Sequence, residues 1–295
     1  MGEALRATAY SVNIKERLDF SCAVFDASGA LIANAPHIPV HLGSMGESIA
    51  AVVRSRGENR DGRGLRRGDV YMLNAPYNGG THLPDITVIL PVFLDDADAA
   101  PAFFVAARGH HADVGGLTPG SMPATSRTVE DEGVLIDDVL LVDEGRLLED
   151  ETRALFASGR YPARNIDMNL ADLKAQVAAC TRGADELHAM VAEFGRPVVE
   201  AYMGHVQSNA EEAVRRALSA LKPGSFAYEM DSGAVIRVRI DVDPDARTAV
   251  VDFTGSSEQL DSNFNAPLSI TRAATLYVFR TLVDDAIPLN EGCLK

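Results

Sequence analysis

The most constraining feature of this sequence is a helical spacing of apolar residues in its second half. Between residues 168 and 221, apolar side chains recur at every third or fourth position. This spacing aligns one apolar stripe on each of two amphipathic helices. Gly195 and Pro197 separate the two helices, and the link between them is short. We therefore expect an antiparallel helical hairpin within residues 166–224.

Strand patterns lie on both sides of this helical region. Residues 20–33 predict two short strands around a turn, and residues 86–94 and 101–107 predict buried strands. After the helices, three short strands precede a helix over 266–283. The predicted class is α+β, with a strand-rich N-terminal part, the helical hairpin and a smaller α/β C-terminal unit. The expected domain boundaries are 1–165, 166–224 and 225–295.

Composition and charge exclude several classes of protein. Of the 295 residues, 46% are apolar and 23% are charged, as in an ordinary globular protein. The formal net charge of −15 disfavours binding to nucleic acid or to an anionic membrane surface. No apolar run has the ~20 residues of a membrane span. The three cysteines lie far apart in the sequence, which is typical of a reduced, cytoplasmic protein.

Histidines are concentrated in the strand-rich part. Five of the seven lie between residues 37 and 111, in loops rich in glycine and proline. Loops of this kind, carried on a strand scaffold, commonly display binding groups. The five are His37, His41, His82, His110 and His111.

Two of these loops combine imidazoles with carboxylates. His82 and Asp85 lie three residues apart, and Pro84 argues against a regular helix there, so a turn can bring both side chains together. A second group follows the strand over 101–107: His110, His111 and Asp113. Two histidines with one or two aspartates suit a borderline divalent ion such as Zn, Mn or Fe. The alternative is that His82 and Asp85 only cap a turn.

Other catalytic templates are missing from the sequence. It contains neither a GxxxxGK[ST] loop nor a strand-associated GxGxxG, so it has no recognisable nucleotide-phosphate cradle. It has no GxSxG elbow either. Cys22 lies in an apolar strand, which favours a core position over a nucleophile. The two loops that combine histidines with aspartates are therefore the main candidates for an active site.

Four longer segments carry a family signal. They are AYSVNIKERLDFSCAVFDASGALIANAPHIPVHLGSM, PYNGGTHLPDITVILPVF, RGHHADVGGLTPGSMP and DSNFNAPLSITRAATLYVFR. Together they resemble the hydantoinase B/oxoprolinase family, from about residue 5 to the end of the chain. That family includes the beta subunits of N-methylhydantoinases and caprolactamase, the C-terminal half of 5-oxoprolinase, and the alpha subunits of acetone and acetophenone carboxylases.

The resemblance implies a divalent metal held by two aspartates and two histidines. Carried over position by position, the HLPD segment supplies His82 and Asp85, and the GHHAD segment supplies His110. The aspartate that ends the first strand, Asp26, would complete the set. The choice of His110 over His111 stays open, and His111 would take a role in catalysis or in substrate contact.

The resemblance also implies a division of labour. A partner subunit of the hydantoinase A type would bind ATP and phosphorylate the carbonyl oxygen of a lactam or hydantoin. This chain would hydrolyse the activated intermediate, because its metal would lower the pKa of a water toward ~7. His111 or Asp113 would take up the proton. Independently of the resemblance, His37 and His41 precede a helix expected over 44–56, and a helix N-terminus favours anions, so they are candidates for binding substrate. The alternative is that both lie in a proline-shaped surface loop.

The chain also departs from the family pattern. Family members continue for roughly as long again beyond the PLNEGCL segment, so we expect this chain to correspond to the N-terminal part only. The apolar face of the 266–283 helix would then need a covering partner. Ala75 also replaces an expected aspartate. Two alternatives to the cyclic amidase stay open: a carboxylase alpha subunit, which is a ligase, and a truncated, non-catalytic interaction module.

Overall fold

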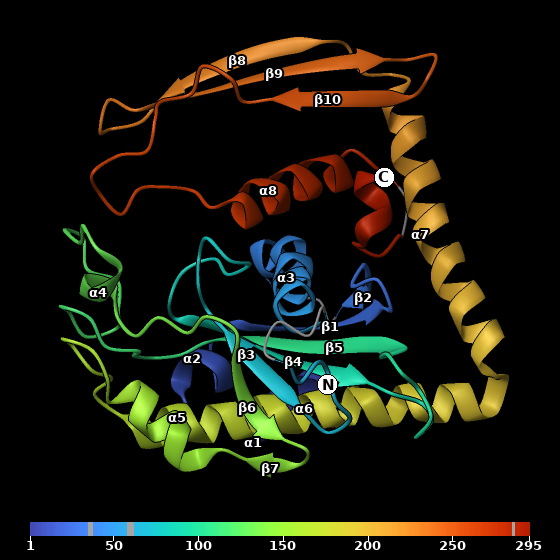
Figure 1. Cartoon of the computed structure of the whole chain (residues 1–295). Helices are drawn as coiled ribbons and strands as arrows, with labels where there is room; N and C mark the ends of the chain where they lie inside the picture. The colour runs from blue at the N-terminus through green and yellow to red at the C-terminus, as the bar shows by residue number, and fades with distance from the viewer. Residues whose placement is uncertain (35–37, 58–61, 285–286) are drawn as a thin grey trace.

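A seven-stranded antiparallel sheet forms the centre of the molecule (Figure 1). The computed structural model describes residues 1–34, 38–57, 62–284 and 287–295. The spatial order of the strands is β2-β1-β5-β4-β3-β6-β7. Their bounds are β1 Phe20–Asp26, β2 Leu31–Asn34, β3 Val70–Leu73, β4 Asp85–Val92, β5 Phe103–His110, β6 Val139–Asp143 and β7 Arg146–Leu147.

Helices cover both faces of this sheet, which buries the central strands. Figure 1 shows α3 (Pro39–Val52) on one face and α6 (Ile166–Phe194) on the other. Residues two apart on a strand share a face, so β4 and β5 each contribute to two apolar layers. The shorter helices are α1 Gly2–Thr8, α2 Val12–Lys15, α4 Val129–Glu132 and α5 Glu149–Phe156. No helix among the described residues is long and apolar enough to cross a bilayer.

The helix after β2 begins earlier than the sequence predicts. α3 starts at Pro39 and ends at Val52, followed by a π-helical turn over Val53–Gly57, whereas we expected a helix over 44–56. Proline suits the first turn of a helix because its fixed φ is already helical and its missing N–H would have no partner there. Ser44, the expected first residue of the helix, is therefore inside it, where its hydroxyl donates to Val40 O at 2.6 Å.

The two long helices do not form an antiparallel hairpin. α7 (Arg196–Leu218) leaves the end of α6 at a steep angle, passes β2 at the end of the large sheet and continues to the three-stranded sheet (Figure 1). The physical reason is the shortness of the connection. Gly195 is both the C-cap of α6 and the N-cap of α7, so a single residue joins the two helices. Reversing the chain direction needs a loop of about 2–5 residues. The two helices exist as predicted, but their mutual arrangement was predicted wrongly.

A three-stranded sheet follows α7, in the order β10-β9-β8. Its strands are β8 Gly224–Glu229, β9 Val235–Asp243 and β10 Thr248–Asp252. The chain then returns as α8 (Leu268–Thr281), which packs on α3, and ends in a 3₁₀ turn over Glu291–Leu294. α3 and α8 approach so closely that a side chain at Gly43 would collide with the backbone of Ala273. The structure is therefore a mixed α/β arrangement around a large antiparallel sheet.

Candidate metal centre

The candidate site lies where β4 begins and β5 ends. The antiparallel register of these strands places Asp85, the first residue of β4, opposite His110, the last residue of β5. His82 comes from the tight turn just before β4, in which the Asp85 N–H donates to the His82 carbonyl at 3.1 Å. Two loops that are far apart in sequence thus deliver their side chains to one end of the sheet.

Asp85 is the centre of this cluster. Its Oδ1 lies 3.2 Å from His110 Nδ1, and its Oδ2 lies 3.2 Å from His82 Nδ1. The two imidazole rings are neighbours, with centroids 5.0 Å apart. One ligand atom from each of the three residues lies within 4.8 Å of the others, which is compatible with a shared metal ion. Thr81 also donates to Asp85 Oδ2, at 2.9 Å.

One oxygen of this carboxylate lacks a well-formed hydrogen bond. Asp85 Oδ1 is buried, and its 3.2 Å contact with His110 Nδ1 lacks hydrogen-bond geometry, so no described residue donates a well-formed hydrogen bond to it. A buried carboxylate oxygen without a partner costs free energy, unless a cation or a donor occupies the position that it faces. With two imidazole nitrogens beside it, the donor set is the mixed nitrogen and oxygen set that Zn, Mn and Fe accept. The residues present therefore fit a divalent metal.

Two further residues border the triad. His41, in the first turn of α3, places Nε2 3.0 Å from Asp85 Oδ2, and its Nδ1 lies 3.3 Å from Ser21 Oγ. Asp19, just before β1, has Oδ2 3.8 Å from His110 Nδ1 and Oδ1 3.9 Å from His41 Nε2. The Asp19 side chain is about one-third exposed, so it closes the cluster on its solvent side.

The electrostatics of the cluster favour an ionised carboxylate. Burial alone would raise the pKa of Asp85, but the adjacent imidazoles of His110, His41 and His82 hold that pKa well below its usual value. Burial alone would likewise lower the pKa of His110, yet Asp85 and Asp19 raise it. Asp85 is thus a permanent negative charge near neutral pH, as a metal ligand has to be.

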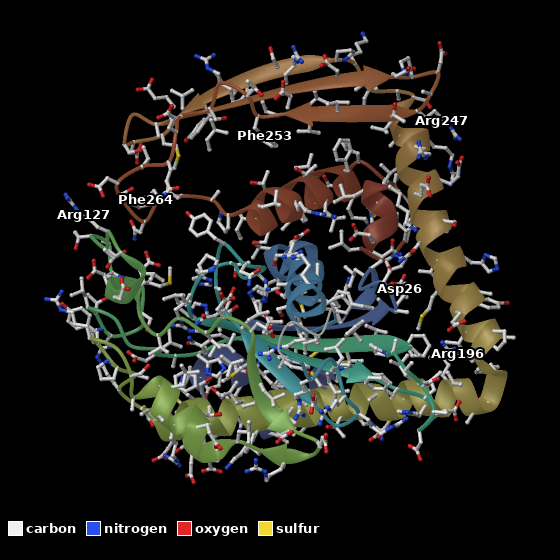
Figure 2. All side chains as sticks on the ribbon, in the orientation of Figure 1. Asp26, Arg127, Arg196, Arg247, Phe253 and Phe264 are labelled. Carbon is white, nitrogen blue, oxygen red and sulfur yellow. The ribbon has the colours of Figure 1, made fainter. Side chains whose placement is uncertain are left out.

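A cleft leads to the exposed side of His82. Its volume is about 570 Å³, and it is lined among others by Tyr77, Thr81 and Arg127. Across the cleft, Asn263 from the loop before α8 donates to Pro123 O at 2.8 Å. Figure 2 shows Arg127 and Phe264 near this side of the molecule. A small molecule therefore has a route to the cluster.

Comparison with known proteins assigns the family. The model of the hydantoinase B/oxoprolinase family matches residues 1–295. The chain belongs to this family. Among curated relatives it is 46% identical to "5-oxoprolinase PfmaA" of Pestalotiopsis fici and 43% identical to the 5-oxoprolinase of Saccharomyces cerevisiae, in each case over 100% of this chain and 23% of the relative. Against a putative D-/L-hydantoinase component of Pseudomonas sp. the identity is 28%, over 100% of this chain and 52% of that protein.

Two solved structures share the fold of this hydantoinase B/oxoprolinase chain. The ATP-dependent caprolactamase of Pseudomonas jessenii superposes with a TM-score of 0.79 at 24% identity, covering 99% of this chain and 51% of that one. A nucleotide-free acetone carboxylase gives 0.84 at 19% identity, covering 99% and 40%. The chain spans about a quarter to a half of the length of the relatives described here.

Asp26, expected to be the fourth ligand, is remote from the cluster. β1 runs antiparallel to β5, so Asp26 pairs with Phe103, seven residues before His110 on β5. Its Oδ1 accepts from Ser28 and Ala30 in the β1–β2 turn, and its Oδ2 accepts from Gln207 at 3.3 Å. Figure 2 shows Asp26 on the side of the molecule where α7 lies. Asp26 stabilises a turn, and the aspartate at the other end of the strand, Asp19, faces the cluster.

His111 points away from the cluster, toward α6. It is fully buried, with Nε2 2.9 Å from Gln176 Oε1 and Nδ1 3.1 Å from Asn169 Nδ2. The Gln176 amide nitrogen donates to Ile86 O and Ala107 O, which leaves its oxygen as the acceptor for an Nε2–H. Burial lowers the pKa of His111, which favours this neutral form. This arrangement supports the β4–β5 pairing and gives His111 no route to a substrate.

Asp113 also serves the local structure. Its Oδ2 accepts from Arg164 Nη1 at 2.7 Å, and its Oδ1 accepts from the Gly115 and Arg164 backbones. Both oxygens therefore pin the loop after β5, and the predicted catalytic role for Asp113 has no support in these contacts. His37 lies outside the described residues. His41, expected to bind substrate ahead of a helix, is inside α3 and contacts the cluster directly.

Proposed function

We propose that this chain is the metal-dependent hydrolytic component of an ATP-dependent cyclic amidase. The observation that carries the proposal is the buried Asp85 carboxylate between His82 and His110, with one oxygen to which no described residue donates a well-formed hydrogen bond. The 5-oxoprolinase and hydantoinase names of its relatives point to a cyclic amide as substrate. A lactam or hydantoin ring is small enough for the cleft beside His82.

The division of labour follows from the chemistry of an amide. A cyclic amide is a poor electrophile, and phosphorylation of its carbonyl oxygen converts that oxygen into a leaving group. The sequence has no phosphate-binding loop, so ATP would be bound by a partner of the hydantoinase A type. The solved caprolactamase is described as ATP-dependent, which is consistent with this scheme.

Each residue of the cluster then has a separate task. His82, Asp85 and His110 would hold the cation, with Asp19 as a fourth ligand on the solvent side. The bound cation supplies a Lewis acid that makes a nearby water more acidic. Thr81 and His41 contact the second oxygen of Asp85 and fix the orientation of the carboxylate. Ser21 in turn fixes the ring of His41.

The test combines this chain with a hydantoinase A-type partner, ATP and either 5-oxoproline or a hydantoin. The expected product is the ring-opened acid, and Asp85→Asn should abolish it because the substitution removes the charge that holds the cation. Ring opening that survives Asp85→Asn would overturn the proposal. Bicarbonate-dependent consumption of a ketone, without ring opening of any amide, would replace it with the carboxylase alternative.

A further inference from the structure

A fully buried arginine lies directly behind the cluster. Arg108 precedes His110 by two residues on β5, so both side chains point to the α3 face of the sheet. Arg108 is the largest fully buried side chain in the described part of the chain. No carboxylate among the described residues forms an ion pair with it. Burying a guanidinium without an ion-pair partner costs free energy, so the presence of Arg108 at this position needs an explanation.

Three hydroxyl groups surround the guanidinium. Nε donates to Thr87 Oγ1 at 2.7 Å, and Nη2 donates to Ser48 Oγ at 2.8 Å. Nη1 donates to Ser44 Oγ. Ser44 follows His41 by three residues and Ser48 follows Ser44 by four, so all three side chains lie on the same face of α3. The planar fork of arginine has the several fixed donors that this arrangement requires.

Each hydroxyl continues to a different segment of the site. Thr87 is on β4, two residues after Asp85. Ser44 Oγ contacts Val40 O at 2.6 Å and His41 O at 3.0 Å, in the turn of α3 that carries His41. Ser48 donates to Gly79 O at 2.6 Å, in the loop that leads to His82. Arg108 is itself on the strand of His110, so this network contacts every segment that supplies the triad, and the turn that supplies His41.

The loop at Gly79 packs so tightly on α3 that the position of Ser48 fixes the position of the loop. Gly79 has φ +88°, and a Cβ there would lie 2.6 Å from Glu47 O and 2.9 Å from Ser48 Cα. The loop backbone thus rests on α3 at the point where Ser48 holds it. A shift of Ser48 would move Gly79, and with it the path of the chain to Thr81 and His82.

We propose that Arg108 is a positioning residue of the metal centre: by binding Thr87, Ser44 and Ser48 together, it holds the segments of Asp85, His41 and His82 in register with His110. This inference rests on the proposed function, because it gives Arg108 a role in metal affinity. Burial lowers the pKa of Arg108 to about 10, so the guanidinium remains charged at neutral pH. Arg108 acts by holding three hydroxyl groups with three donor nitrogens, and a lysine would supply the charge without these fixed donor positions.

The test measures Zn²⁺ affinity of the full chain by competition with a chromophoric chelator. The Ser44→Ala/Ser48→Ala double variant keeps the arginine but removes two of its acceptors, and Arg108→Lys keeps the charge but loses the fork. Both should weaken Zn²⁺ binding by roughly 10- to 100-fold, as is typical when residues that orient ligands are lost. Thr152→Ala is the matched control, since Thr152 is a buried helical hydroxyl that donates four residues back, to Leu148 O, away from the cluster.

Amide hydrogen exchange of the same metal-free proteins gives a second, independent measurement. In the Arg108 and serine variants, exchange should accelerate at least about tenfold within residues 39–48 of α3 and residues 77–82 of the loop, while exchange in the sheet strands stays unchanged. Zn²⁺ affinities within twofold of wild type, with unchanged exchange in both segments, would overturn the role of Arg108. Tighter Zn²⁺ binding in Arg108→Lys would overturn it as well. If the wild type binds no Zn²⁺, the proposed function fails, and the exchange data alone decide on Arg108.

Discussion

Asp85 and His110 face each other across β4 and β5, with Oδ1 and Nδ1 3.2 Å apart. Because they are register partners, the proposed metal centre depends on correct pairing of the two strands whose ends carry it. The same pairing aligns Thr87 with Arg108, one step further into the sheet. Chemistry and fold are thus coupled at this edge, and changes that disturb the pairing should appear first as a loss of metal affinity.

The two aspartates at the ends of β1 should differ sharply in their effect on the metal. Asp19→Asn should weaken Zn²⁺ binding by roughly 10- to 100-fold, because Asp19 Oδ2 lies 3.8 Å from His110 Nδ1. Asp26→Asn should leave the affinity unchanged, since Asp26 is at the opposite end of the strand. Chelator competition on both variants checks this. Equal losses, or a loss confined to Asp26→Asn, would contradict the placement.

The difference between Asp19 and Asp26 shows what the sequence could and could not predict. Residue types and spacing in the HLPD and GHHAD segments indicated a metal donor set, and the family resemblance pointed to His82, Asp85 and His110, which the structure brings together. Which end of β1 lies beside them depends on strand direction, and that is a property of the whole sheet. If β1 and the strand ending in His110 are antiparallel partners, Asp19, the residue just before β1, lies beside His110, and Asp26 lies at the far end.

Two other expectations failed for similar reasons. Helical periodicity located α6 and α7, but periodicity says nothing about the angle between two helices joined by the single residue Gly195. For α3, the expected start at residue 44 overlooked Pro39, although proline is over-represented at the first position of a helix. His41 was therefore placed outside the helix that in fact carries it into the cluster.

His111 should make stability depend on pH. The pKa of His111 is lowered in the folded state. Below pH 6.5, its ordinary value, His111 therefore binds a proton in the unfolded chain but stays neutral in the native protein. This contribution is complete above pH ~6.5 and declines as the pH falls below it. Urea unfolding at pH 7.5 and 5.5 measures the decline. In His111→Leu the decline should be smaller, and an identical decline in both proteins would contradict a neutral, buried ring.

The same variant tests whether the contacts of His111 with α6 stabilise the β4–β5 pair. His111→Leu removes the donor to Gln176 Oε1 and one of the two acceptors of Asn169 Nδ2, which should lower the free energy of unfolding at pH 7.5 by about 1–3 kcal/mol. His205→Leu, at a position on α7 away from this contact, is the matched control and should change it by less than about 0.5 kcal/mol. Similar losses in the two variants would remove His111 from the support of the strand pair.

Exposed apolar surfaces predict that the chain alone associates with itself. On one face of the small sheet Phe226 and Tyr228 are 66% and 58% exposed, and on α8 Leu268 and Val278 are 67% and 51% exposed. Figure 2 shows Phe253 on the side of that sheet that faces α8. Apolar patches of this kind mark contact surfaces. Sedimentation should show oligomers that Phe226→Ser/Tyr228→Ser reduces, whereas a stable monomer that binds no hydrophobic dye would contradict the prediction.

ATP use should require a second protein. Because the sequence has no phosphate-binding loop, the purified chain should show no ATP hydrolysis above the buffer rate. A malachite green assay for phosphate, with and without a hydantoinase A-type partner, checks this. Efficient ATP hydrolysis by this chain alone, still present after a further purification step, would refute the division of labour between the two proteins.

The metal content of the chain tests the proposed metal centre directly. Elemental analysis of protein loaded with Zn, Mn or Fe and then desalted should find close to one divalent ion per chain. His82→Ala and Asp85→Ala should each lose most of it, because they remove two of the three ligands that the structure brings within 4.8 Å. A clearly substoichiometric wild type, or full retention in both variants, would show that the cluster of His82, Asp85 and His110 is not a metal centre.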